Sequence, residues 1–203
     1  MTRSAEDQTE ASDEMLMVRY QRGNREAFAT LVGRHSADVF SLSYYLLGDE
    51  NAAERVARET FRHVASDAEA FHLESQFRAW LFGITHRLVM EACADATPNS
   101  QHDWSVRKLS RLELSPADSA LPPASSRAYR SQLLIRRVAG RVSSLPLEMR
   151  EAFLLKQVAQ LSIPAIADVM GIDADMARQL IRLAFDRIQE SVADTEEYAR
   201  ALR

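Results

Sequence analysis

The stretch from Leu161 to Gln189 constrains the fold of this chain more than any other. Its apolar residues recur at the spacings of two short helices that share a core. Gly171 stands between them, where the first helix must end and a residue that tolerates positive φ is favoured. Asp173 follows, and its carboxylate can cap the next helix by accepting N–H groups of the first turn. The stretch therefore predicts two helices joined by a tight turn.

Two interpretations of this helical pair remain open. One is a helix-turn-helix, whose second helix enters the DNA major groove. The small residue Ala167, at the point where two helices would cross, fits that motif. The other is an ordinary helical hairpin with no role in nucleic-acid binding. The pattern favours the helix-turn-helix.

Composition limits the fold class and the environment. With 203 residues, of which 46% are hydrophobic, the chain can form one large or two small domains, and six glycines and six prolines are too few for a turn-rich β architecture. No apolar run is long enough to cross a bilayer, and the N-terminus lacks the apolar core of a secretory signal. The single cysteine, Cys93, excludes an intramolecular disulfide and is expected to be a small core residue. We expect an all-α cytoplasmic protein without membrane insertion.

The chain shows no pattern that predicts catalysis or cofactor binding. It has no glycine-rich phosphate loop and no histidine pair at metal-binding spacing on one helix face. His35 lies on an apolar stripe, where a core histidine is expected rather than a metal ligand. We therefore expect no enzyme activity, no catalytic residues, no metal site and no cofactor.

Helical periodicity falls into two blocks separated by a proline-containing segment. The predicted segments are a disordered tail (1–12), a four-helix domain (13–95), a flexible linker (96–127), a second helical domain with the helix-turn-helix (128–195) and a C-terminal tail (196–203). Helices of the first domain are expected from Asp13 to Gly23, from Asn24 to Gly48, over about 50–65 and over about 74–94.

The net charge of −4 restricts how the protein can bind DNA. A protein that coats DNA without sequence preference would be basic, since affinity for phosphate comes from Lys and Arg. Residues 13–95 contain nine arginines and thirteen acidic residues, whereas residues 127–190 contain ten basic and seven acidic residues. Any DNA binding must therefore be local or depend on a partner, and the second domain is the better candidate.

Two helices of the first domain carry side chains that can be interpreted in two ways. The third helix has an outer face formed by Glu54, Arg55, Arg58, Glu59 and Arg62 with Phe61 beside them, which is either a solvated face or a docking surface for another protein. The fourth helix carries Phe77, Arg78, Trp80, His86 and Arg87. Its aromatic residues either fill the core or stack on unpaired bases.

Several stretches in order resemble the extracytoplasmic-function group of the sigma-70 family, the bacterial RNA polymerase initiation factors. They are RGNREAFATLVGRH, YLLGDENAAERVARETF, FRAWLFGITHRLV and SLPLEMREAFLLKQVAQLSIPAIADVMGI. The FRAWL segment and the LP-x(3)-R-x-x-F-x-L opening before the helix-turn-helix are the most specific of these. The resemblance covers about residues 13–95 and 128–190.

The resemblance implies a set of partners and site residues. The third helix would dock on the coiled coil of the polymerase β′ subunit through Glu54, Arg55, Arg58, Glu59 and Phe61. The fourth helix would capture the melted −10 promoter strand near Phe77, Arg78, Trp80, His86 and Arg87. The second domain would recognise the −35 element with Arg178, Gln179 and Arg182 and contact the polymerase β flap. An anti-sigma factor is a further possible partner, and the polymerase would supply most of the non-specific affinity for DNA.

The chain departs from the family pattern at each of these surfaces. Arg55 and Arg58 stand where the family usually has Asp and Gln, which moves the docking face toward positive charge. No Lys or Arg occurs from Val89 to Val106, where basic residues usually follow the fourth helix. Asp175 lies near the start of the recognition helix, where a carboxylate repels phosphate.

These departures leave three hypotheses. The first is a working alternative sigma factor that recognises −10 and −35 elements. The second is a sigma-like regulator that binds an anti-sigma factor or DNA without full initiation activity. The third, which the ordered first domain disfavours, is a helix-turn-helix regulator with no link to polymerase.

Overall fold

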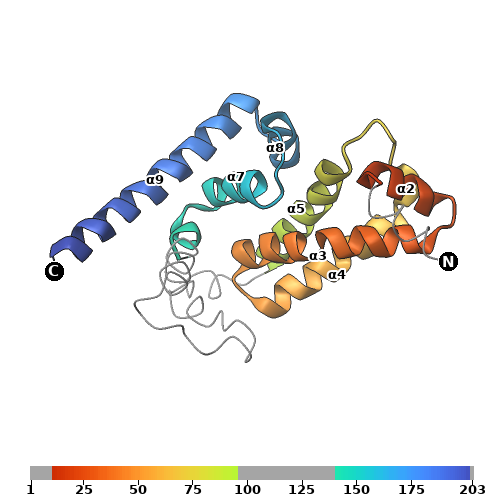
Figure 1. The fold of residues 1–203 in the computed structure, drawn as a ribbon, viewed down its shortest axis with the longest axis horizontal. Helices are drawn as coiled ribbons and strands as arrows, with labels where there is room; N and C mark the ends of the chain where they lie inside the picture. The colour runs from red at the N-terminus through yellow and green to blue at the C-terminus, as the bar shows by residue number, and fades with distance from the viewer. Residues whose placement is uncertain (1–10, 96–139, 202–203) are drawn as a thin grey trace.

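The computed structural model describes residues 11–95 and 140–201, with side chains as far as residues 94 and 189. All regular secondary structure within these ranges is helical, as predicted (Figure 1). The elements are α2 (Asp13–Gln21), α3 (Arg25–Leu47), α4 (Glu50–Ser66), the 3₁₀ turn η1 (Ala68–Ala70), α5 (Phe77–Asp95), α7 (Leu147–Gln157), α8 (Ile163–Met170) and α9 (Ala174–Ala201). The predicted linker and the predicted start of the second domain at 128 lie outside the described residues, as do residues 1–10.

The first domain is built around the long helix α3, which packs against α2, α4 and α5 (Figure 1). Asn24 caps α3 by accepting a hydrogen bond from the Ala27 N–H at 3.2 Å, as the sequence predicted. Gly48 ends the helix with a φ of 61°, a conformation that glycine adopts without steric cost. The side chains that fill this domain's core are Leu16, Met17, Leu31, His35, Val39, Leu42, Leu46, Val64, Phe77, Leu81 and Phe82.

The start of α5 is held by contacts from α2. The Phe77 N–H donates to Glu14 Oε1 at 3.1 Å, so this carboxylate satisfies a donor of the first helical turn. The Gln21 amide donates to the carbonyl oxygens of Ala68 and Phe71 and fixes the segment that precedes α5. The helix begins three residues later than the predicted start at 74, because residues 72–75 form a turn closed by a Ser75 N–H to His72 carbonyl hydrogen bond of 2.9 Å.

The predicted pair of helices between 161 and 189 is confirmed as α8 and the beginning of α9. Ser162 caps α8, and Gly171 ends it with a φ of 67°. Asp173 accepts a hydrogen bond from the Met176 N–H at 2.7 Å and so caps α9 as predicted. Helix α9 has 28 residues and runs away from the body of the protein, through residues of the stretch assigned to a C-terminal tail (Figure 1).

The turn between α7 and α8 contains a residue in the left-handed backbone conformation. Gln160 has a φ of 53°, and within the described ranges it is the one residue other than glycine with positive φ. The Lys156 ammonium donates to the Leu161 carbonyl at 3.2 Å and bridges this turn. Val158 and Ala159 lie directly before the strained residue, so the turn determines where their carbonyl oxygens point.

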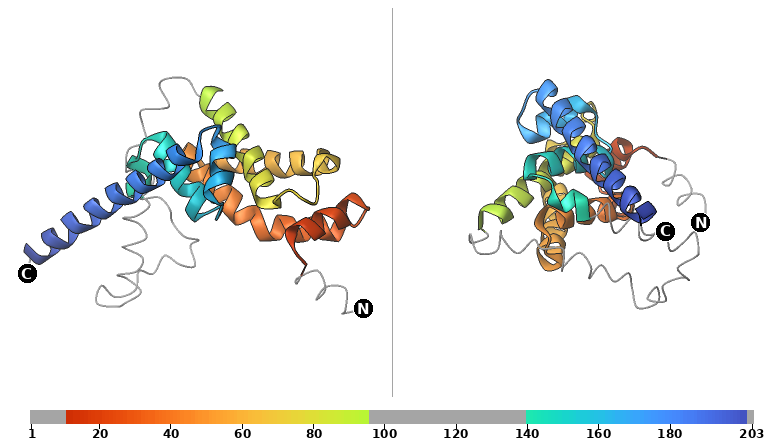
Figure 2. Two further views of the ribbon diagram at one scale, coloured as in Figure 1. Left: turned by 90° about the horizontal axis from the view of Figure 1, so that it is seen from above. Right: turned by 90° about the vertical axis from the view of Figure 1, so that its left-hand side faces the viewer.

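The two domains pack against each other, which the sequence did not predict. Helix α8 lies against α5, and α7 lies against α3 (Figures 1 and 2). The buried apolar residues of both domains form a single connected core. Gly83 of α5 faces Val169 of α8, and a Cβ added at position 83 would lie 4.0 Å from Val169 Cγ2, an ordinary van der Waals distance. The described ranges therefore form one closed arrangement of two domains.

Candidate functional site

The outer face of α4 presents exposed charges of both signs. Glu54, Arg55 and Arg58 are exposed, and Phe61 packs against the core from the edge of this face. The opposite face of α4 is buried through Ala53, Val56, Thr60 and Val64. This separation fixes which side of the helix a partner can reach.

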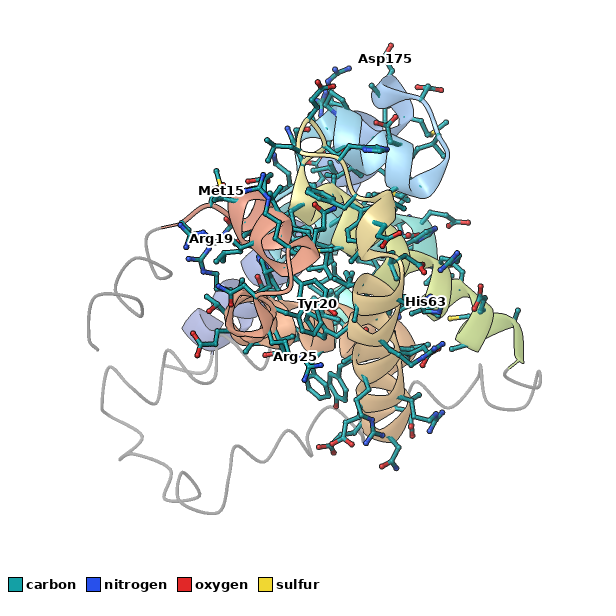
Figure 3. The ribbon with its side chains drawn as sticks, turned by 90° about the vertical axis from the view of Figure 1, so that its right-hand side faces the viewer. Met15, Arg19, Tyr20, Arg25, His63 and Asp175 are labelled. Carbon is teal, nitrogen blue, oxygen red and sulfur yellow. The ribbon has the colours of Figure 1, made fainter. Side chains whose placement is uncertain are left out.

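Glu59 lies on the same outer face and is paired within the helix. The Arg62 Nε atom donates to Glu59 Oε2 at 2.9 Å, and His63 Nε2 lies 3.4 Å from Glu59 Oε1 (Figure 3 labels His63). The hydrogen bond from Arg62 lowers the pKa of Glu59 and raises the pKa of Arg62. An exposed pair of this kind contributes little to stability. A partner can therefore replace Arg62 at the Glu59 carboxylate at small cost.

The aromatic residues of α5 are packed inside the first domain. The Phe77 side chain is fully buried, and its ring lies 6.2 Å from the ring of Trp80. Trp80 is half-buried and lies 5.3 Å from the ring of Phe71. In this arrangement Phe77 is not accessible to a nucleic-acid base, whereas part of Trp80 is.

Arg78 points from α5 to the second domain. Its Nε atom donates to the Ala159 carbonyl at 2.9 Å, and one of its terminal nitrogens donates to the Val158 carbonyl at 3.3 Å and to Asp38 Oδ2 at 3.1 Å. The guanidinium has five N–H donors in a fixed fork, so it can serve these acceptors at once. Arg78 thus joins α3, α5 and the turn after α7.

A cluster of charged side chains lies behind Arg78. His35 Nδ1 is 3.4 Å from the other terminal nitrogen of Arg78, and His35 Nε2 is 2.7 Å from Asp13 Oδ2. Arg34 donates to Asp13 Oδ1 at 2.7 Å. Burial alone would raise the pKa of Asp13, but the hydrogen bonds from His35 and Arg34 outweigh it and lower that pKa. His35 is 2% exposed, which confirms its prediction as a core histidine.

The two remaining residues predicted at the −10 strand have different surroundings. The His86 Nδ1 atom meets the Glu151 carboxylate of α7 in an ion pair across the domain boundary. The Glu151 side chain is only 6% exposed. Arg87, next along the helix, is exposed. Of the five residues predicted at the −10 strand, Arg78 and His86 therefore contact the second domain.

An open cavity of about 560 Å³ lies where α5 faces α8. Ser75, Trp80 and Arg87 line it from the first domain, and Asp168 and Val169 line it from the second. Residues predicted at the −10 strand thus share a groove with a helix of the helix-turn-helix.

The outer face of α9 carries all three residues predicted at the −35 element. Arg178, Gln179 and Arg182 are exposed, and Arg178 forms an ion pair with Asp175 of the same helix. Figure 3 shows Asp175 at the tip of the helix-turn-helix, pointing away from the first domain. Three exposed apolar side chains, Met176, Leu183 and Phe185, lie on the same helix. The face is accessible, but it is neither uniformly basic nor uniformly polar.

The described part of the chain holds neither a group of metal ligands nor a membrane-spanning helix. Within it, no three His, Cys, Asp or Glu side chains are close enough together to hold a metal ion. None of its helices is both long and apolar enough to span a bilayer.

Comparison with protein families gives two matches in the expected order. The Sigma-70 region 2 model matches residues 31–98, and the Sigma-70 region 4 model matches residues 135–188. The chain belongs to the sigma-70 family. Its relatives place it in the extracytoplasmic-function group, as the sequence motifs predicted, and this alternative sigma factor acts by recognition rather than by catalysis.

Similar sigma factors match along most of their length. The ECF RNA polymerase sigma factor SigW of Bacillus subtilis is 24% identical over 177 residues, which cover 86% of this chain and 93% of SigW. The RNA polymerase sigma-H factor of Pseudomonas aeruginosa is 28% identical over 189 residues, covering 91% and 95%. Among solved structures, CnrH in complex with the cytosolic domain of CnrY has a TM-score of 0.62 at 21% identity, covering 90% of this chain and 97% of CnrH. RpoE in complex with the anti-sigma factor NepR from Bartonella quintana has a TM-score of 0.59 at 17% identity, covering 82% and 96%.

The contacts between region 2 and region 4 were missed by the sequence reasoning. The sequence analysis did not single out Glu151, and it assigned Arg78 to the promoter strand. The backbone carbonyls that Arg78 binds lie about 80 positions away and leave no mark on side-chain periodicity. The available signal was Arg150-Glu151, two adjacent charges that directly precede the apolar run 152–155.

Proposed function

We propose that this sigma factor acts in the cytoplasm, where it binds RNA polymerase core and directs it to promoters with recognisable −10 and −35 elements. The observation that carries the proposal is the order of a region 2 match and a region 4 match on one chain. Polymerase binding also accounts for the net charge of −4, since the polymerase contributes affinity for DNA that the factor lacks.

Each surface has a proposed role that follows from what it exposes. The α4 face, with Glu54, Arg55, Arg58, Glu59 and Phe61, docks on the β′ coiled coil. Helix α5 binds the −10 strand through Trp80 and Arg87, together with Arg78 and His86 once they leave the second domain; Phe77 supports Trp80 from the core. On α9, Arg178, Gln179 and Arg182 contact the −35 element, and the rest of region 4 contacts the β flap.

Co-purification with core polymerase followed by run-off transcription tests the proposal. The full chain is incubated with core polymerase and a genomic library of promoter fragments, and transcripts are mapped. We expect stable binding to core and discrete start sites that disappear without the factor. Failure to bind core would exclude the role as an initiation factor.

A second candidate is a sigma-like regulator that binds an anti-sigma factor without full initiation. It is favoured by the exposed positive charges of Arg55 and Arg58 on the docking face. Two solved relatives are complexes with an anti-sigma factor or a cytosolic partner domain, so such a partner is proposed here as well. Replacing Arg55 with Asp and Arg58 with Gln distinguishes the initiation factor from the sigma-like regulator. Under this second candidate the double variant gains core binding that the native chain lacks.

A further inference from the structure

The recognition helix α9 carries two exposed apolar side chains next to the residues proposed for DNA contact. Met176 is 45% exposed and Leu183 is 46% exposed. They are seven residues apart, which is close to two turns of an α-helix, so they lie on one stripe of α9. Phe185 is exposed as well, but its ring packs on the Phe153 ring of α7 at 5.2 Å. Packing inside the second domain accounts for the position of Phe185, whereas Met176 and Leu183 present an apolar stripe to solvent.

The buried face of α9 determines where this apolar stripe points. The residues of that face are small or aliphatic: Ala177, Ile181, Ala184 and Ile188. With 3.6 residues per turn, Gln179 lies opposite this buried face. Met176 and Leu183 lie on one side of Gln179, and Arg178 and Arg182 lie on the other side. The outer face of α9 thus has an apolar edge, an amide in the middle and a basic edge.

Cationic side chains surround the apolar pair on this outer face. Arg187 is exposed and continues the apolar stripe, because it follows Met176 by eleven residues, or about three turns. Among the residues of α9 whose side chains are described, three arginines stand against two aspartates, and Asp175 is paired with Arg178. A partner that complements this face therefore has negative charge at its edges and apolar groups between them.

The DNA major groove offers this combination of groups. Phosphates line its edges, and thymine is the base that presents a methyl group within it, where apolar side chains contact it. The amide of a glutamine binds adenine through two hydrogen bonds, and adenine pairs with thymine. Met176 lies in the first turn of α9, and the N-terminal residues of such a helix contact base edges in the groove. The apolar edge and Gln179 therefore favour the same base pair, A·T.

We propose that Met176 and Leu183 are specificity-determining residues, which contact thymine methyl groups in the major groove and restrict the −35 element to A·T pairs at those positions. The inference rests on the proposed function for the role of α9, and it adds the base that this face selects. A helix rises about 1.5 Å per residue, so the two side chains are about 10 Å apart along α9. Successive base pairs are about 3.4 Å apart along the duplex, so the two thymine-containing pairs are about three steps apart.

Replacing thymine with uracil in the promoter tests the methyl contact directly. Uracil keeps the hydrogen-bonding groups of thymine and lacks only the 5-methyl group. The native full chain with core polymerase is bound, at one salt concentration, to promoter fragments recovered by run-off transcription. Each fragment is synthesised in two forms, with thymine or with deoxyuridine in the −35 element, which is located by footprinting. We expect the deoxyuridine form to bind about fourfold more weakly for each contacted methyl group, equivalent to about 0.8 kcal/mol.

Two matched double variants assign the effect to these residues. Met176→Ala with Leu183→Ala shortens both exposed side chains and should bind the thymine and deoxyuridine forms equally well. Met15→Ala with Leu73→Ala is the control, because it removes the same residue types from the first domain at positions that are 44% and 56% exposed. The control should keep the full preference for thymine. Since all four side chains are exposed, neither double variant is expected to disturb the core.

The possible results separate this inference from the proposed function. A native chain that binds core polymerase and initiates, but binds both DNA forms equally, would overturn the inference alone. Retained preference for thymine in the Met176→Ala, Leu183→Ala variant would also overturn it. If that variant weakens both forms equally and loses core polymerase without DNA, the face contacts the polymerase instead of bases. A native chain that does not bind core polymerase would refute the proposed function, and the inference with it.

Discussion

The Nε atom of Arg78 donates a hydrogen bond to the carbonyl oxygen of Ala159 at 2.9 Å, across 81 positions of sequence. The acceptor lies just before Gln160, whose φ of 53° turns the chain from α7 into α8. A strained turn in region 4 is thus joined to a cation in region 2. The hydrogen bond holds the domains at the face where the proposed −10 contacts lie.

Arg78→Lys is expected to weaken the closed structure. Lysine keeps the charge but lacks the guanidinium fork, so it cannot serve the Val158 and Ala159 carbonyls together with Asp38. We expect a loss of about 1–2 kcal/mol in the free energy of unfolding, measured by urea denaturation. Arg87→Lys on the exposed side of α5 is the control and should change it by less than about 0.5 kcal/mol. Equal effects of the two substitutions would contradict the role of Arg78.

Gly171→Ala is expected to destabilise the helix-turn-helix. Its φ of 67° lies in the left-handed region, where a Cβ costs about 1–2 kcal/mol. Gly33 provides a matched control, since it lies inside α3 with open space around a Cβ and without positive φ. Gly33→Ala should stabilise the protein by about 0.5–1 kcal/mol through helix propensity. Thermal unfolding of the two variants should therefore shift in opposite directions.

Local chemistry explains which parts of the fold the sequence could predict. Four helix boundaries depend on a single residue each. The side chains of Asn24 and Asp173 cap helix starts, and the positive φ of Gly48 and Gly171 ends helices, so these positions could be predicted from the sequence. The buried stripe of α3 followed from its period. These features need no knowledge of distant residues.

The contacts between domains depend on information that periodicity does not contain. Arg78 was assigned to DNA because the resemblance to the sigma-70 family implied that role, and the sequence could not show that backbone carbonyls of the second domain would occupy its N–H donors. Phe77 was open between core and DNA, and its burial follows from the packing of Phe71 and Trp80 around it. The roles of the α4 and α9 faces remain predictions, since exposure alone does not identify a partner.

Asp13→Asn is expected to destabilise the first domain in a pH-dependent way. The pKa of Asp13 in the folded protein lies below its ordinary value of 3.8, so its contribution is present at neutral pH and is lost as the pH falls below 3.8 through the folded-state value. We expect a deficit of about 1–2 kcal/mol at neutral pH, from lost hydrogen bonds to His35 and Arg34. Urea denaturation at a series of pH values should show the difference in unfolding free energy between the variant and the native chain narrowing as the pH falls below 3.8. If this difference in unfolding free energy does not change with pH, the destabilisation does not come from the Asp13 carboxylate charge.

Asp175→Asn is expected to strengthen promoter binding, whereas Arg178→Ala should weaken it. Asp175 holds Arg178 in an ion pair at the tip of the helix-turn-helix and adds a negative charge where phosphate would approach. The amide removes that charge and releases the guanidinium.

If Arg178 contacts a base edge, its loss should cost about 1–3 kcal/mol of discrimination at one −35 position. Binding of the polymerase complex to a panel of singly substituted −35 sequences measures the affinity gained in Asp175→Asn and the discrimination lost in Arg178→Ala. A uniform loss over the panel would instead identify Arg178 as a phosphate contact, with a smaller salt dependence than the native chain.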